Sequence, residues 1–157
     1  MTRAFRPLYT RPMKPYLLAP ALLLAACSSQ PAPKLAVTDA AVTERTDAGT
    51  VITFTVHADN ATGEPLPLRE VEYEVWLHGK PVFKGTRSAM ATVRAYGTQD
   101  FTLPAAIPAQ LETPAAYSIQ GTITYLVPGA LAEALFDLNV LKPKTSFRGR
   151  GVVEAAP

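Results

Sequence analysis

The chain has 157 residues, of which 48% are hydrophobic and 18% charged, so it is long enough to form one domain with a substantial core. Four of its 15 Lys and Arg residues but none of its 13 Asp and Glu residues precede residue 27, which leaves the remainder weakly acidic. This charge balance argues against nucleic-acid binding, and the single cysteine, Cys27, excludes an intrachain disulfide, a cysteine-rich zinc site and a redox pair.

Residues 1–26 have the organisation of a signal peptide. A basic start is followed by an apolar run over residues 16–26, which is shorter than the roughly 20 residues that span a bilayer. The run contains Pro20, which argues against a buried helix. It ends in Leu24-Ala25-Ala26-Cys27, which resembles the lipobox of bacterial lipoproteins. Translation could also start at Met13, because Lys14 would still supply a positive charge.

The lipobox resemblance implies cleavage between Ala26 and Cys27 and a diacylglyceryl group, with acyl chains such as palmitate, on the Cys27 thiol. Two or more acyl chains hold a protein stably on a membrane. Ser28 stands where an Asp would favour inner-membrane retention, so we expect the outer membrane, facing the periplasm, if the cell is Gram-negative. Residues 27–34 are polar and proline-containing, which is typical of a tether.

Alternating apolar and polar residues dominate the remaining chain. Residues 50–58 place Ile52, Phe54 and Val56 on one face, and residues 69–77 place Val71, Tyr73 and Val75 on one face with Glu70, Glu72, Glu74 and Trp76 on the other. This period of two predicts strands with one buried and one solvated face. His78-Gly79 predicts a hairpin turn into a returning strand over residues 81–85.

Further strands are expected from weaker or later alternation. They are residues 118–126, with Ile119, Ile123 and Tyr125 inward, and the weaker candidates 35–44, 89–94, 99–103 and 145–154. Turns are expected where Gly, Pro and Asn gather, at residues 60–63, 65–67, 96–97 and 104–108. Residues 128–137 are Ala- and Leu-rich and predict a short helix that covers one open end of the fold.

About seven short strands with this punctuation predict an all-β, antiparallel sandwich of immunoglobulin or fibronectin type III shape. No internal repeat is visible. We therefore expect one domain over residues 35–154, followed by a short tail, 155–157.

The order of these motifs resembles the late-embryogenesis-abundant (LEA) type 2 domain, also called the water-stress and hypersensitive-response (WHy) domain. A strand ends in Asn60, a Leu-rich bend follows at residues 66–68, and the segment Val71 to Gly85 and then Phe101-Thr102-Leu103-Pro104 come after it. Residues 117–147 are similar to bacterial lipoprotein members. Ala61 replaces the family's usual proline and His78 its usual asparagine. The resemblance implies a fibronectin-like fold, a role in desiccation and stress tolerance, and no enzymatic residues to transfer.

Neither histidine has the surroundings of a metal site. His57 and His78 fall on different strand segments and lack a third ligand, so a surface histidine and a turn histidine are the simpler interpretation. Glu70, Glu72 and Glu74 form a row that could serve acid–base chemistry, but a solvated face opposite Lys80, Lys84 or Arg87 explains them better.

Three other residues could contact a partner. Trp76 shares the face of the glutamates and is either an exposed contact or covered by a loop or the short helix. Arg148 and Arg150 could bind phosphate or lipid headgroups, although solvated arginines are the plainer interpretation. No motif for a nucleophile, a phosphate loop, a cofactor or a small-molecule substrate is present.

The two resemblances, together with the absence of catalytic motifs, imply a non-enzymatic, lipid-anchored protein that protects the cell envelope under desiccation. The alternative hypothesis is an interaction module that docks an envelope or client protein through a sheet edge or the Trp76 face.

Overall fold

The computed structural model describes residues 32–154. The predicted signal peptide, Cys27 and the tail at 155–157 lie outside this range. The described chain forms seven strands and one helix: β1 (Lys34–Thr46), β2 (Gly49–Asn60), β3 (Leu66–Leu77), β4 (Lys80–Val93), β5 (Gly97–Ile107), β6 (Ala115–Tyr125), α1 (Ala130–Asp137) and β7 (Lys144–Val153).

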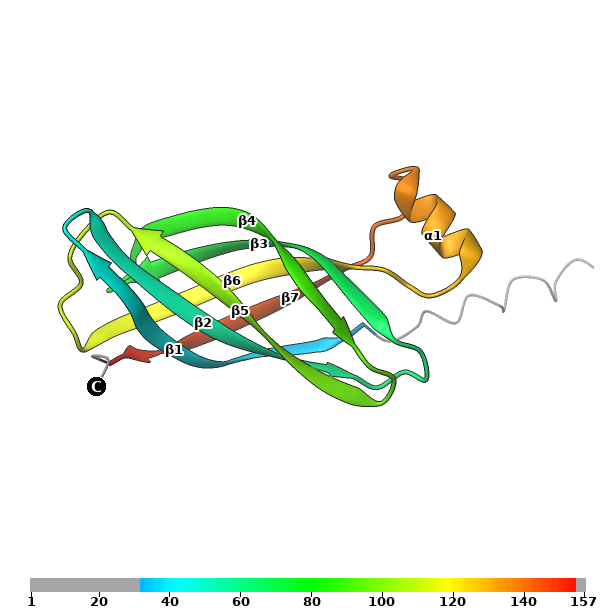
Figure 1. The fold of residues 1–157 in the computed structure, drawn as a ribbon, viewed down its shortest axis with the longest axis horizontal. Helices are drawn as coiled ribbons and strands as arrows, with labels where there is room; N and C mark the ends of the chain where they lie inside the picture. Colours follow the sequence, from blue (N-terminus) through cyan, green and yellow to red (C-terminus); the bar gives the residue numbers. More distant parts are fainter. Residues whose placement is uncertain (1–31, 155–157) are drawn as a thin grey trace, which may run out of the picture.

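Two antiparallel sheets pack face to face in an elongated sandwich (Figure 1). Sheet A has the strand order β1-β2-β5 and sheet B the order β4-β3-β6-β7, so the predicted all-β sandwich is confirmed. The edges of the two sheets lie against each other, β1 beside β7 and β4 beside β5. At the first of these seams, a Cβ on Gly149 would lie 2.6 Å from Val37 Cβ, so the absence of a side chain at Gly149 allows the close approach.

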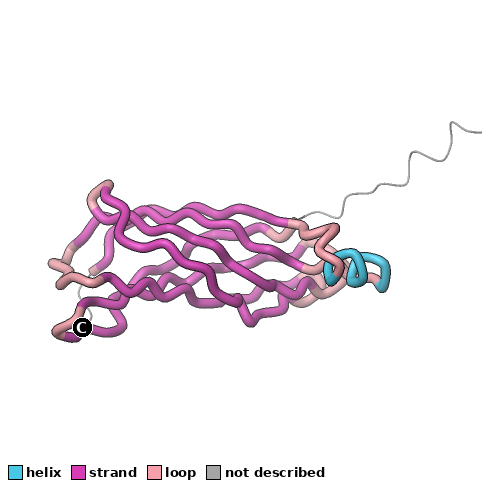
Figure 2. Tube along the Cα trace, turned by 90° about the horizontal axis from the view of Figure 1, so that it is seen from above, coloured by secondary structure: helices cyan, strands magenta, loops and turns pink. Residues whose placement is uncertain are grey.

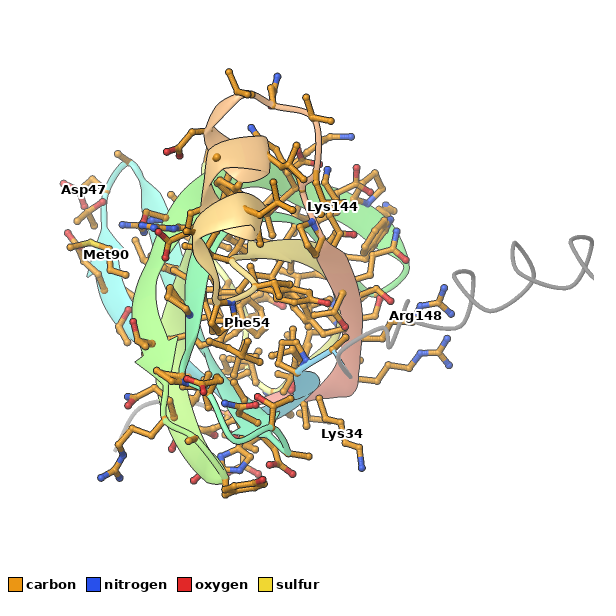
Figure 3. The ribbon with its side chains drawn as sticks, turned by 90° about the vertical axis from the view of Figure 1, so that its right-hand side faces the viewer. Lys34, Asp47, Phe54, Met90, Lys144 and Arg148 are labelled. Carbon is orange, nitrogen blue, oxygen red and sulfur yellow. The ribbon has the colours of Figure 1, made fainter. Side chains whose placement is uncertain are left out.

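The alternation predicted for β2 and β3 is present in the structure. In β2 every second residue is buried, and Phe54 lies at the centre of the sandwich (Figure 3). Its ring meets Tyr117 of β6 edge to face, with ring centroids 5.2 Å apart, a favourable aromatic geometry. Tyr73 of β3 crosses the core, and its hydroxyl donates to the Pro104 carbonyl of β5. Burial raises the pKa of the Tyr73 phenol, so it keeps this proton at neutral pH.

Two proline-containing segments predicted as turns, residues 65–67 and 104–108, lie mostly in strands instead. Pro67 lies inside β3 and Pro104 inside β5. The Pro104 carbonyl points to Tyr73, away from β2. In a strand, the N–H and the carbonyl of one residue point to the same side. The missing N–H of Pro104 therefore removes no bond to β2, and β5 can continue to Ile107 as an edge strand.

The returning strand predicted for residues 81–85 and the separate strand predicted for 89–94 are one strand, β4. A register shift separates the pairs Leu68–Ala91 and Glu70–Ser88, so β4 carries one extra residue there. Met90, with φ 47° and an exposed side chain, lies in this β-bulge. The bulge interrupts the alternation, which is why the sequence pattern breaks in the middle of the strand.

The helix α1 begins two residues later than predicted and does not cover the core. It lies beyond the ends of the strands, at one end of the long axis (Figure 2), and none of its residues is buried. The predicted closure of the open end by this helix is therefore wrong.

A buried asparagine organises the loops at the same end of the molecule. The side chain of Asn60, at the end of β2, is fully buried. Its Nδ2 donates to the carbonyls of Glu64, Val93 and Arg94 at 2.8, 3.4 and 3.0 Å, and its Oδ1 accepts from the backbone and hydroxyl of Thr62. One side chain thus links the β2–β3 loop to the β4–β5 turn.

Candidate functional site

The outer face of sheet B gathers most of the residues that the sequence singled out. Register brings Glu74 of β3 opposite Lys84 of β4 and opposite Gln120 of β6, which in turn lies opposite Arg148 of β7. The neighbouring row contains Trp76, Ser118 and Arg150. We call this set of seven residues the Trp76 face.

Two shallow depressions lie on this face, with volumes of about 580 and 260 Å³. Gln120 and Arg148 line both, and Trp76 lines the smaller one with Arg150. Trp76 is half-buried. It lies at the end of β3 that is far from α1. The neighbouring Leu77 pairs with Tyr117 near the start of β6, whereas Leu68, at the other end of β3, pairs with Tyr125, next to the helix. The suggestion that the short helix covers Trp76 is therefore wrong.

Glu74, the carboxylate of the Trp76 face, belongs to a surface ion pair rather than to an acid–base pair. Lys84 Nζ lies 2.5 Å from Glu74 Oε1, which confirms the predicted cross-strand pairing. The hydrogen bond and charge of Glu74 raise the pKa of Lys84, which therefore stays protonated at neutral pH. Such exposed pairs contribute little to stability, and this one leaves Glu74 occupied as an acceptor.

The two histidines lie on different sheets and do not meet. His57, on β2, contacts Asp100 of β5 through Nδ1 at 2.6 Å; the Asp100 side chain is exposed and that of His57 is partly exposed. His78 occupies the β3–β4 turn with φ 48°, followed by Gly79 with φ 79°, the backbone conformation of a type I′ hairpin. Asparagine and histidine both adopt positive φ more often than most residues, so His78 fits the turn position at which the family usually has asparagine. Across residues 32–154, no cluster of three or more His, Cys, Asp and Glu side chains could hold a metal ion.

Sequence reasoning missed the partners of Trp76. It placed Arg148 and Arg150 on a solvated final strand, but the order β3-β6-β7 brings them to the tryptophan through Ser118 and Gln120. Strand order depends on long-range pairing that alternation does not encode, so no local signal could have revealed this grouping. The Trp76 face offers an aromatic surface, two guanidinium groups and neutral hydrogen-bonding side chains, which suit binding of a partner.

The family model for late embryogenesis abundant proteins of type 2 matches residues 55–156. The chain belongs to this family. No curated protein sequence is significantly similar to it.

Two solved structures share the fold of this LEA type 2 chain. One is an Arabidopsis thaliana protein, 14% identical, with a TM-score of 0.59 over 87% of this chain and 91% of that chain. The other is a putative late embryogenesis abundant protein, 16% identical, with a TM-score of 0.59 over 79% of this chain and 71% of that chain. At these identities the likeness concerns the fold alone. Within residues 32–154, no helix is both long and apolar enough to cross a membrane.

Proposed function

We propose that this LEA type 2 protein is a non-enzymatic lipoprotein that protects neighbouring proteins or the membrane surface of the cell envelope when water is withdrawn. Membership of the LEA type 2 family, over residues 55–156, carries the proposal. The exposed ion pair on the Trp76 face and the separated histidines are consistent with a protein that works without catalysis.

The sandwich is suited to a role that requires it to stay monomeric when concentrated. Because β1 lies beside β7 and β4 beside β5, the sheet edges among residues 32–154 lie next to one another, which limits the access of a further strand to them. Open edges are templates for strand pairing and aggregation, which drying would promote. The same arrangement disfavours docking through a sheet edge.

A drying experiment tests protection. The chain from Ser28 to Pro157 is dried and rehydrated with a labile reporter enzyme, and the recovered activity is compared with that obtained with an inert globular protein at equal mass. We expect recovery well above this control. A variant with a destabilised sandwich, Asn60→Asp, should protect less if the folded domain is the active form. Recovery equal to the inert protein would contradict the proposal.

We propose that Cys27 carries the lipid and that Ala26 is the last residue removed with the signal peptide, since Leu24 to Cys27 resembles a lipobox. In a Gram-negative host, the wild-type chain should incorporate labelled palmitate and fractionate with the outer membrane. Cys27→Ala should abolish the labelling. Ser28→Asp should retain the label but shift the protein towards the inner membrane. Labelling that persists in Cys27→Ala would refute attachment at this residue.

The Trp76 face supports a second candidate function, the docking of an envelope protein. The observation in its favour is the half-exposed Trp76 beside Arg150, because Trp and Arg are enriched at the centres of interfaces. Failure of protection in the drying experiment would make this the leading candidate.

A further inference from the structure

Residues 130–141, which we call the apolar hook, expose large aliphatic side chains. Leu131, Leu138 and Val140 are 74%, 72% and 69% exposed, and Leu141 is also exposed. Leu131 and Leu138 are seven residues apart and so share one face of the helical turns, with half-buried Leu135 between them. The rest of the described surface exposes only three other large hydrophobic side chains, Met90, Tyr96 and Val152. An apolar patch this concentrated is typical of an interaction surface.

The hook has a defined shape although it adds nothing to the core. The helix has eight residues, no side-chain cap and no buried residue, and isolated helices this short are marginal in water. The chain after it folds back, because the N–H groups of Val140 and Leu141 both donate to the Leu135 carbonyl. Contact with an apolar environment would stabilise such a segment.

The hook lies at the end of the sandwich where the described chain begins. Thr145 Oγ1 donates to the Pro33 carbonyl, so the start of β1 lies beside the start of β7, directly after the hook. Figure 3 views the molecule from this end, with α1 in front of the sheets and Lys144 beside it. Cys27 precedes Ala32 by five residues, a span of at most about 18 Å. A lipid on Cys27 would hold this end close to the membrane.

From this placement we infer that the apolar hook inserts its aliphatic side chains into the lipid surface that holds the protein. The inference rests on the proposed attachment at Cys27, which fixes the end of the sandwich that faces the bilayer. Interfacial helices bury an apolar face about 5–10 Å deep at the boundary of headgroups and acyl chains, a depth that leucine side chains on a protruding segment can reach. The membrane contact would then have two points, the lipid and the hook.

The charges at this end favour apolar insertion over attraction to anionic lipids. Four basic side chains, Lys34, Arg94, Lys142 and Lys144, are offset by four acidic ones, Asp59, Glu64, Glu133 and Asp137. Lys142 also lies over the Phe136 ring, 5.6 Å from its centroid, where its ammonium can extend towards headgroups. Insertion should therefore depend little on salt or on the anionic lipid content.

The test places a tryptophan in the hook. The chain from Cys27 to Pro157 contains all the buried hydrophobic residues that the structure describes within residues 32–154, so it retains this core. In a Trp76→Phe background, Leu138→Trp introduces the only tryptophan. Coupling through the single thiol, Cys27, to a maleimide lipid in phosphatidylcholine vesicles reproduces the tether without cellular lipidation. Quenching is then measured with brominated phosphatidylcholine. Val152→Trp, on β7 at the opposite end, is the matched control.

We expect brominated lipid to lower the emission at position 138 by roughly twofold or more, because insertion to about 5–10 Å reaches the acyl boundary, and to leave position 152 unchanged. Adding Leu131→Ser and Val140→Ser should reduce the quenching without changing the unfolding transition. Equal quenching at the two positions, or none, would overturn the inference. Self-association of the uncoupled chain would also overturn the inference if Val140→Ser abolished it and Val152→Ser did not. The hook would then bind a second copy of the chain rather than lipid. Quenching at 138 alongside failed palmitate labelling in cells would refute only the native anchor.

Discussion

Replacing Asn60 by Asp should destabilise the sandwich by about 3 kcal/mol or more, although the two side chains have nearly the same shape. The Nδ2 group of Asn60 faces three carbonyl oxygens, those of Glu64, Val93 and Arg94. A carboxylate cannot donate to them, and its negative charge would be buried against them. Chemical denaturation of the two proteins measures the difference in the free energy of unfolding.

The pH dependence of this loss identifies its cause. The repulsive site should raise the pKa of the new carboxyl above the unfolded value of about 3.9. Below about pH 4 the new carboxyl is protonated in both the folded and the unfolded protein, so the electrostatic part of the stability loss vanishes. This part should grow as the pH rises, and it should level off above the folded-state pKa of the carboxyl. Asn139→Asp is the matched control, because Asn139 is exposed and its change should cost less than about 0.5 kcal/mol. Equal losses at the two positions would show that Asn60 does not hold the loops.

The elements that sequence analysis predicted well are those in which every local signal agrees. In β2 and in residues 70–77 of β3 the alternation is uninterrupted, one face enters the core, and His78-Gly79 supplies the two positive φ values of the turn between β3 and β4. Pairing register follows directly from such a pattern, since a shift by one residue would expose Phe54 or Tyr73.

The predictions failed where a local signal is overridden by a neighbour distant in sequence. Pro104 indicates a turn in isolation, but an edge position and a hydrogen bond from Tyr73 allow it to remain in β5. The Ala- and Leu-rich helix suggested a buried face, yet none of its residues is buried among residues 32–154. The grouping of Trp76 with Arg148 and Arg150 depends on strand order in the same way. Asn60 was recognised only as the end of a strand and the start of a turn, because its hydrogen bonds join that turn to residues 93 and 94, more than 30 positions away.

Gly121→Ala should lower the free energy of unfolding by about 2–3 kcal/mol through overpacking. Gly121 carries no turn signal in the sequence, yet the packing of sheet B depends on it. Gly121 lies opposite Tyr73 on β3 and Phe147 on β7, in the middle of sheet B. A Cβ there would lie 2.5 Å from Phe147 Cζ and 2.8 Å from the Glu72 carbonyl oxygen. The phenylalanine ring thus occupies the space that a side chain would need.

Gly97→Ala is the matched control for this prediction. Gly97 is also a strand glycine, but the nearest atoms to a new Cβ are 3.4 Å away, an ordinary contact, so this change should be neutral or stabilise by less than about 1 kcal/mol. Combining Gly121→Ala with Phe147→Leu should recover part of the loss, giving a favourable coupling of about 1 kcal/mol in a double-mutant cycle. The recovery should stay partial, because the Glu72 carbonyl belongs to the paired backbone of β3 and cannot withdraw. Strict additivity of the two changes would mean that the Phe147 ring is not what excludes a side chain at position 121.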